Sequence, residues 1–444
     1  MSILIKNANI VNEGKIINAD VLIENQLISK IGVNLSSEGV DEIVDASGKY
    51  LLPGAIDDQV HFREPGLTHK ADIYTEAKSA VAGGVTSYME MPNTNPPATT
   101  LDLLEQKYSR ASEVSLANYS FFMGTTNSNL DEILKIDSSK VCGVKIFMGS
   151  STGDMLVDNV AELEKVFSQV KTLIAVHCED DPMVKQNAEK FKTEFGDNLE
   201  PKHHSLIRSA EACYKSSSFA VGLAQKFGTR LHILHISTAK ELELFRNDIP
   251  LKEKKITAEA CIHHLWFSDE DYVTKGNYIK WNPAVKTAND RDNILKAVLD
   301  DRIDVIATDH APHTIAEKEQ SYAAAPSGGP LVQHSVVAML EMYHQGKISL
   351  EKIVQKMSHN VAELFRIQKR GFIKEGYFAD LVLVDLNDSW TVDKSNVLSK
   401  CGWSPFEGFT FKSKVIQTYV SGHKVYDHGK FDETVKGERL TFNV

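Results

Sequence analysis

The chain has 444 residues, of which 42% are hydrophobic and 25% charged, as is typical of a globular protein with a large buried core. Its formal net charge of −11 argues against a nucleic-acid partner, because such proteins usually carry a basic face that neutralises phosphates. No signal peptide or membrane-spanning stretch is evident, and the five cysteines are odd in number and never form a C-x-x-C pair. We therefore expect a cytoplasmic protein with no membrane association, no disulfide framework and no thiolate zinc site.

The first segment of the chain is rich in β-forming residues. Between Ile3 and Ile31, short strand-like runs alternate with turn signals such as Asn12-Glu13-Gly14. Similar runs of β-forming residues occur near the C-terminus, in residues 379–384 and 415–426. Two β-rich ends can pair with each other, so we predict a small β-sandwich domain that is formed from residues 1–52 and 368–444.

The central segment, residues 53–367, alternates apolar strand-like runs with helical patterns. Buried parallel strands are continuous aliphatic and β-branched runs, and a βα alternation implies a parallel sheet. The pattern predicts an α/β fold, a (β/α)8 barrel of the TIM type. The strand-like runs are residues 55–56, 87–89, 144–147, 173–176, 231–234 and 305–307, and the clearest helical spacings are 102–108, 159–170, 210–227 and 350–364.

Polar side chains lie within or just after these runs, where barrel strands end. A single histidine in such a place is more often a buried, hydrogen-bonded imidazole than a ligand. Active sites of TIM-type barrels, however, form at the C-terminal ends of several strands at once, so we expect one site from His61, Arg63, Asn93, Lys145, His177, His235 and Asp309. Imidazole and carboxylate ligands suit zinc or a similar divalent ion, whose bound water can attack a carbonyl carbon.

Three segments of the sequence resemble the dihydroorotase family: residues 53–66, which contain Arg63-Glu64-Pro65-Gly66, then Met91-Pro92-Asn93-Thr94, and residues 308–313. The resemblance runs nearly end to end. It implies a barrel that carries a small β domain made from both chain ends. It also implies the reversible conversion of N-carbamoyl-L-aspartate to (S)-dihydroorotate in pyrimidine biosynthesis, by a homodimer or larger assembly.

The resemblance further implies a set of metal ligands. Two metals, commonly zinc, would be bridged by hydroxide and by a carboxylated lysine, for which Lys145 is the matching residue. A carbamate makes physical sense there, because a lysine ammonium would repel a metal pair; the simpler alternative is a lysine that forms an ion pair. His61 would bind the first metal, and His177 and His235 the second. Asp309 would be a ligand and would carry the proton from the hydroxide to the departing amide nitrogen.

Substrate recognition places a demand on this acidic protein, because the carboxylate of dihydroorotate needs local positive groups. Arg63, Asn93 and His313 match the family's carboxylate-binding positions, although a surface ion pair is the other interpretation of Arg63. Asn282 resembles a family position that contacts the substrate ring. Residues 314–325 are polar and lack strong periodicity, so they predict a mobile loop over the site.

One position departs from the family pattern. The family's first strand carries His-x-His, and Gln59 stands in place of the first histidine. An amide oxygen is a weaker donor than imidazole, so the first metal either binds less tightly, uses Gln59 or Asp57, or gains a water. We therefore expect one or two zinc ions per chain.

Three functions remain open at this level. An active dihydroorotase is preferred, because every other ligand and the carboxylate-binding residues are present. A hydantoinase or allantoinase is a second possibility, although substrates of those enzymes lack the carboxylate. A catalytically silent homologue that supports a transcarbamoylase partner is the third, and Gln59 alone favours it.

Overall fold

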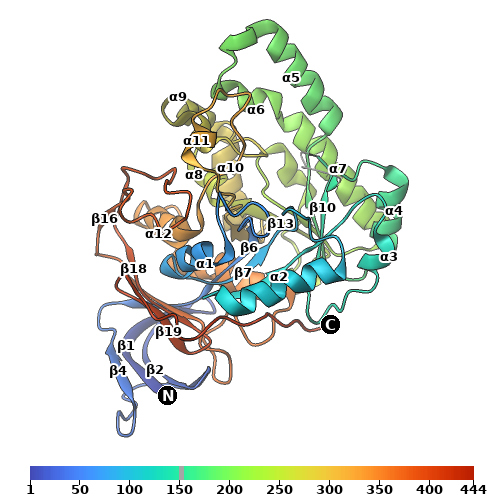
Figure 1. Cartoon of the computed structure of the whole chain (residues 1–444). Coiled ribbons are helices and arrows are strands. Elements are labelled where there is room, and N and C mark those ends of the chain that lie inside the picture. The colour runs from blue at the N-terminus through green and yellow to red at the C-terminus, as the bar shows by residue number, and fades with distance from the viewer. Residues whose placement is uncertain (150–154) are drawn as a thin grey trace.

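The computed structural model describes residues 1–149 and 155–444, and a barrel of parallel strands forms its centre (Figure 1). β8 and β9 are separated only by Phe122 and so join the two sheets that make up the barrel wall. His61 N donates a hydrogen bond to His310 O (2.7 Å), which closes the barrel between its first and last strands. The barrel strands are β6 (Ala55–Val60), β7 (Val85–Glu90), β8 (Asn118–Phe121), β9 (Met123–Gly124), β10 (Val144–Phe147), β11 (Ile174–His177), β12 (Leu231–Ile233), β13 (Ile256–Cys261) and β14 (Val305–Ala307).

The predicted α/β barrel is confirmed, but two of its strand positions, β8–β9 and β13, were not predicted. Both are buried, yet they carry polar side chains: Asn118 and Ser120 in β8, and Thr257 and Glu259 in β13. These residues interrupt the aliphatic run by which a buried parallel strand is recognised in a sequence.

Helices lie between the barrel strands along the chain, and all four predicted helical segments are helical. In α7, Ser209 accepts a hydrogen bond from Ala212 N at the start, and Gly228 ends the helix in a left-handed conformation (φ 68°). None of the helices in the described ranges is both long and apolar enough to cross a membrane. The helices are α1 (Ile73–Ala82), α2 (Leu101–Val114), α3 (Leu130–Ile133), α4 (Val160–Gln169), α5 (Asp181–Phe195), α6 (His204–Ile207), α7 (Ala210–Phe227), α8 (Ile262–Trp266), α9 (Tyr272–Lys275), α10 (Ala288–Leu299), α11 (Ile315–Lys318), α12 (Ser335–His344), α13 (Leu350–Val354) and α14 (Asn360–Phe365).

Strands from both ends of the chain share one separate sheet, in which blue and red strands lie together in Figure 1. The central link is β5, which pairs in parallel with β1 and antiparallel with β15. Alternate side chains of these strands, such as Ile3, Ile5 and Leu381, form a core of their own. The strands are β1 (Ser2–Asn12), β2 (Lys15–Glu24), β3 (Leu27–Gly32), β4 (Glu42–Asp45), β5 (Tyr50–Pro53), β15 (Leu381–Asp385), β18 (Lys414–Val420), β19 (His423–Asp427) and β20 (Lys430–Phe431); β16 (Trp390–Thr391) and β17 (Thr410–Phe411) pair separately.

An extension built from α5 and α6 follows β11 and projects away from the barrel (Figure 1). Its base is a small apolar cluster of Val184, Ile207, Ala212 and Tyr322. Because Tyr322 comes from the segment after β14, this cluster ties the extension to the loops at the carboxyl ends of the strands.

Candidate active site

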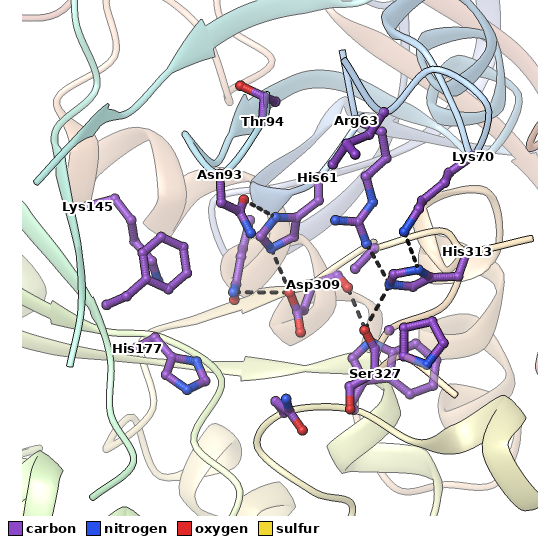
Figure 2. Close-up of a pocket in the computed structure, with 18 of the residues that line it drawn as sticks. His61, Arg63, Lys70, Asn93, Thr94, Lys145, His177, Asp309, His313 and Ser327 are labelled. Carbon is purple, nitrogen blue, oxygen red and sulfur yellow. Dashed lines mark hydrogen bonds and ion pairs between the residues drawn. The ribbon is translucent and has the colours of Figure 1, made fainter. Parts of the chain in front are cut away.

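A cavity of about 760 Å³ lies at the carboxyl ends of the barrel strands (Figure 2). Every residue that was predicted to bind metal or substrate lines this cavity, and so does Gln59. The structure thus brings together side chains from across the barrel: His61, Arg63, Asn93, Lys145, His177, His235, Asn282, Asp309 and His313.

Three of these residues have left-handed backbone conformations: Arg63 (φ 72°), His235 (φ 40°) and Asp309 (φ 48°). For residues with a side chain, this costs on the order of 1–3 kcal/mol and tends to occur at functional sites. Side chains from other segments bind the backbone at two of these residues. His235 N donates to Glu259 Oε1 (2.8 Å), and Trp281 Nε1 donates to Asp309 O (3.2 Å). The chain therefore turns sharply where these side chains enter the cavity.

His177 and His235 face each other, with Nδ1 of His177 2.9 Å from Nε2 of His235. Nε2 of His177 lies 3.0 Å from Glu179 Oε2, and when it donates its proton there, Nδ1 is left unprotonated. Burial lowers the pKa of both imidazoles, so both rings are neutral at pH 7, the state that binds metal. Carboxylates commonly orient metal-binding histidines in this way. The pair is therefore suited to a divalent ion.

Glu179 is itself paired with Arg208. Burial opposes ionisation of this carboxyl group, but Arg208 and His177 outweigh it and lower the pKa of Glu179 to about 2. Glu179 is therefore ionised at neutral pH and can hold the His177 ring in one orientation.

His61 has a similar arrangement on the other side of the cavity. Its Nδ1 lies 2.7 Å from Asn93 Oδ1, which can only accept, so Nδ1 carries the proton. Burial lowers the pKa of His61, and the neutral ring then presents an unprotonated Nε2 only 3.1 Å from Asp309 Oδ1. Two electron-rich atoms at that separation are well suited to a shared cation. Asn93 thus orients a metal-type ligand in addition to lining the cavity.

Lys145 is almost fully buried, and its Nζ lies 4.6 Å from the centre of the Phe147 ring. Burial lowers the pKa of Lys145 to about 7, against the opposing charges of Asp309 and Glu259. A large share of the side chain is then an unprotonated amine at neutral pH. That is the form of lysine that reacts with carbon dioxide.

Gln59, which replaces the family's histidine, makes contacts on two sides. Its Nε2 donates to Asp309 Oδ1 (3.2 Å), and Cys261 Sγ lies 3.7 Å from its Oε1. Asp57, the other replacement ligand considered, accepts hydrogen bonds from Thr308 Oγ1 (2.6 Å) and Thr308 N (3.2 Å) and does not line the cavity. Of the two, only Gln59 lines the cavity beside Asp309.

Arg63 approaches the opposite end of the cavity. Its Nε donates to Pro312 O (3.0 Å), and its Nη2 lies 3.0 Å from His313 Nε2. Burial lowers the pKa of Arg63 to about 10, so the guanidinium keeps its charge at neutral pH. The alternative of a surface ion pair does not hold, because the neighbouring carboxylates have other partners: Glu64 pairs with Arg110, and Asp72 with Lys400.

Asn282 is oriented by the segment after α5. His204 Nε2 lies 3.1 Å from Asn282 Oδ1 and 2.7 Å from Trp281 O, and His204 Nδ1 lies 2.8 Å from the Tyr322 hydroxyl. With the carboxamide oxygen engaged in this way, the Asn282 amide nitrogen is the group left for a ligand.

The segment 314–325, predicted as a mobile loop, contains the short helix α11 and is tied down by two buried lysines. Lys280 Nζ donates to Tyr322 O (2.6 Å), and Lys318 Nζ donates to Pro326 O (2.9 Å) and Gly328 O (2.8 Å). Lysine ammonium groups can only donate, so carbonyl oxygens of an irregular loop are suitable partners. The loop after β14 is therefore held in place by hydrogen bonds from two buried lysines.

A second cluster of metal-type side chains lies in the barrel interior. One ligand atom from each of Asp58, His232 and Glu259 lies within 4.8 Å of the others, and all three residues are fully buried. Burial disfavours the imidazolium, but Asp58 and Glu259 outweigh it and raise the pKa of His232 to about 9. With His232 Nε2 3.2 Å from Asp58 Oδ2, the cluster is an internal ion-paired group at neutral pH.

Sequence reasoning gave no role to Lys70, Glu179 or Arg208. Glu179 carried a usable signal, because a carboxylate two residues after a metal-type histidine is a candidate for orienting it. Lys70, which lines the cavity, and Arg208 lie in irregular segments. No periodicity or motif marks their positions, since their contacts depend on how the loops fold.

Relatives in sequence and similar solved structures both cover nearly the whole chain, but the former are dihydroorotases and the latter are hydantoinases. The model of the amidohydrolase family matches residues 50–425. The chain is 33% identical to a dihydroorotase from Halobacterium salinarum, over 92% of this chain and 93% of that protein. It is also 33% identical to a dihydroorotase from Ligilactobacillus salivarius, over 96% and 99% of the two chains. Among solved structures, the L-hydantoinase (dihydropyrimidinase) from Arthrobacter aurescens has a TM-score of 0.93 and 26% identity over 99% of both chains.

Proposed function

This chain belongs to the amidohydrolase family and, within it, to the dihydroorotases, and we propose that it interconverts (S)-dihydroorotate and N-carbamoyl-L-aspartate in pyrimidine biosynthesis. One observation supports this assignment above the others. A single cavity joins imidazole and carboxylate groups at one end to the buried guanidinium of Arg63 at the other. A cyclic amide with a free carboxylate matches both ends.

The family is metal-dependent, and we propose one or two zinc ions per chain, held by His61, Lys145, His177, His235 and Asp309, with Lys145 carboxylated. An unprotonated His177 Nδ1 that faces His235, and an unprotonated His61 Nε2 that faces Asp309, support this donor set. Such an ion, when bound, polarises the amide carbonyl and lowers the pKa of a water molecule.

The residues of the chain supply the remaining steps. Asp309 accepts a proton from the attacking water and returns it to the departing amide nitrogen, as a general base that becomes a general acid. Gln59 Nε2 holds one oxygen of this carboxylate, which fixes its direction. Arg63, Asn93 and His313 bind the substrate carboxylate, and the Asn282 amide contacts the ring.

We expect Arg63→Met to raise the KM for dihydroorotate about 10- to 100-fold, because a hydrogen bond to a charged group contributes about 1.5–3 kcal/mol. Steady-state kinetics should show a much smaller change in kcat, since the carboxylate lies away from the reacting bond. Arg246→Met, which removes an exposed arginine paired with Asp248, is the matched control. An unchanged KM in Arg63→Met would reject the proposed carboxylate contact.

Gln59→His should restore the first histidine of the family's His-x-His pair and tighten the metal site near Asp309. We expect the metal content that survives dialysis against a chelator to rise, with affinity stronger by about tenfold or more, the scale on which even outer-shell partners act. Elemental analysis of both proteins measures this. Equal metal content would mean that the side chain at position 59 does not face the metal.

The experiment that tests the function is hydrolysis of L-dihydroorotate by the purified protein, alongside hydantoin and allantoin, with metal content measured on the same sample. Turnover of dihydroorotate alone supports the proposal. Turnover of hydantoin instead favours the cyclic amidase alternative, for which the hydantoinase-like fold is a precedent. No turnover despite bound metal favours a silent homologue beside a transcarbamoylase.

We further propose a cytoplasmic location, which fits five cysteines that are all free and buried. A homodimer or larger assembly, and a small β domain from residues 1–52 and 368–444 beside a barrel of residues 53–367, remain predictions. Size-exclusion chromatography with light scattering measures the assembly.

A further inference from the structure

His313 lies between donors and an acceptor at the carboxylate-binding end of the cavity (Figure 2). Lys70 Nζ lies 3.1 Å from its Nδ1. Its Nε2 lies 3.0 Å from Ser327 O and also 3.0 Å from Arg63 Nη2. Burial, together with the charge of Arg63, lowers the pKa of His313 to about 3, so the ring is neutral and carries one proton.

The partners of the ring decide which nitrogen carries that proton. An ammonium can only donate and a carbonyl oxygen can only accept. With the proton on Nε2, the ring accepts from Lys70 and donates to Ser327 O, which satisfies two contacts, and only the contact with Arg63 is donor to donor. With the proton on Nδ1, only the contact with Arg63 is satisfied. Lys70 therefore decides which tautomer is favoured. Without Lys70, each tautomer of His313 would have one satisfied hydrogen bond, to Ser327 O in one case and from Arg63 in the other.

Local structure holds Lys70 in this position. Glu317 Oε1 pairs with Lys70 Nζ at 2.9 Å, and Glu317 is fixed at the start of α11, where Thr314 N donates to its Oε2 (2.9 Å). The distance from Glu317 Oε2 to His313 Nδ1 is 3.7 Å, too long for a hydrogen bond, so Lys70 is the direct partner of this nitrogen.

The Ser327 carbonyl reaches the ring because the next residue is glycine. Gly328 has φ 123°, and a Cβ there would lie 2.5 Å from Ala311 O. A residue with a side chain would therefore displace this backbone and the acceptor that faces Nε2 of His313.

We propose that Lys70, held by Glu317, is a positioning residue that fixes the Nε2–H form of His313 and so provides a second donor beside Arg63 for the substrate carboxylate. The inference rests on the proposed function. Arg63 Nη2 and His313 Nε2–H lie donor to donor, and Ser327 O accepts the ring proton. A carboxylate oxygen that enters beside Ser327 O can accept from the ring and from the guanidinium together. Lys70 acts through the ring, which distinguishes its role from that of the guanidinium.

The test compares Lys70→Met and Lys70→Arg with Lys165→Met, an exposed lysine paired with Glu162 on α4. We expect Lys70→Met to raise the KM for L-dihydroorotate about twofold, because only about half of the His313 rings are then in the form that binds the carboxylate, with little change in kcat. Lys70→Arg, which keeps a donor for Nδ1, should recover most of the loss. The control should behave like the original protein.

Side-chain 15N NMR of histidine-labelled protein reads the tautomer directly, with His313→Gln used to assign the signal. We expect Nε2–H in the original protein and a mixture of both forms in Lys70→Met. An unchanged KM, or a pure Nε2–H form in Lys70→Met, overturns the proposal. If the original protein does not hydrolyse dihydroorotate, the proposed function fails, and the NMR comparison still decides whether Lys70 sets the tautomer.

Discussion

Replacing Asp309 with asparagine should lower kcat for dihydroorotate by about 10²- to 10⁴-fold, the range that a positioned general acid–base group contributes. The amide has nearly the same size and can still accept the hydrogen bond from Gln59 Nε2. It cannot take up a proton from water and return it to the amide nitrogen. An amide oxygen is also a weaker ligand than a carboxylate beside His61.

Steady-state kinetics and a thermal unfolding midpoint, measured on the same samples, separate loss of chemistry from loss of fold. Asp248→Asn removes an exposed aspartate paired with Arg246 and serves as the matched control. Near-normal turnover by Asp309→Asn would mean that another group carries the proton.

Lys145→Met should abolish both metal retention and activity. Methionine is unbranched and of similar length, so it fills the same buried space, and it also removes the cost of burying an amine. It cannot carry a carbamate, so the proposed shared ligand is lost. We expect metal affinity to fall by more than about 100-fold, which is the upper range for loss of an outer-shell partner alone.

Elemental analysis gives the metal content, and native mass spectrometry should find the original chain, but not the variant, heavier by one carbon dioxide. Lys356→Met is a suitable control, because Lys356 is also fully buried but donates to Ile303 O, just before β14 begins and away from the cavity. Full metal retention by Lys145→Met would contradict the proposed ligand role.

The sequence by itself identified the main candidates for the site. His61, His177, His235 and Asp309 were predicted to meet because each lies at the end of a strand-like run, and the carboxyl ends of barrel strands converge on one axis. The pairing of the two chain ends in one sheet was also predicted, from β-rich runs at both termini. These features depend on local patterns, and local patterns are visible in a sequence.

Tertiary structure alone decided how those side chains are oriented. That Asn93 fixes the proton of His61 and that Lys70 faces His313 follow from hydrogen bonds between separate loops. Glu179 orients His177 from two residues away, and its own partner, Arg208, comes from another segment. Lys70 and His313 are 243 residues apart, and no periodicity relates them. Strands β8 and β13 were missed for a related reason, since their polar residues are tolerated inside the barrel only because other strands surround them. The sequence determined which groups enter the cavity, while the folding of the loops determined which atom of each group faces a ligand.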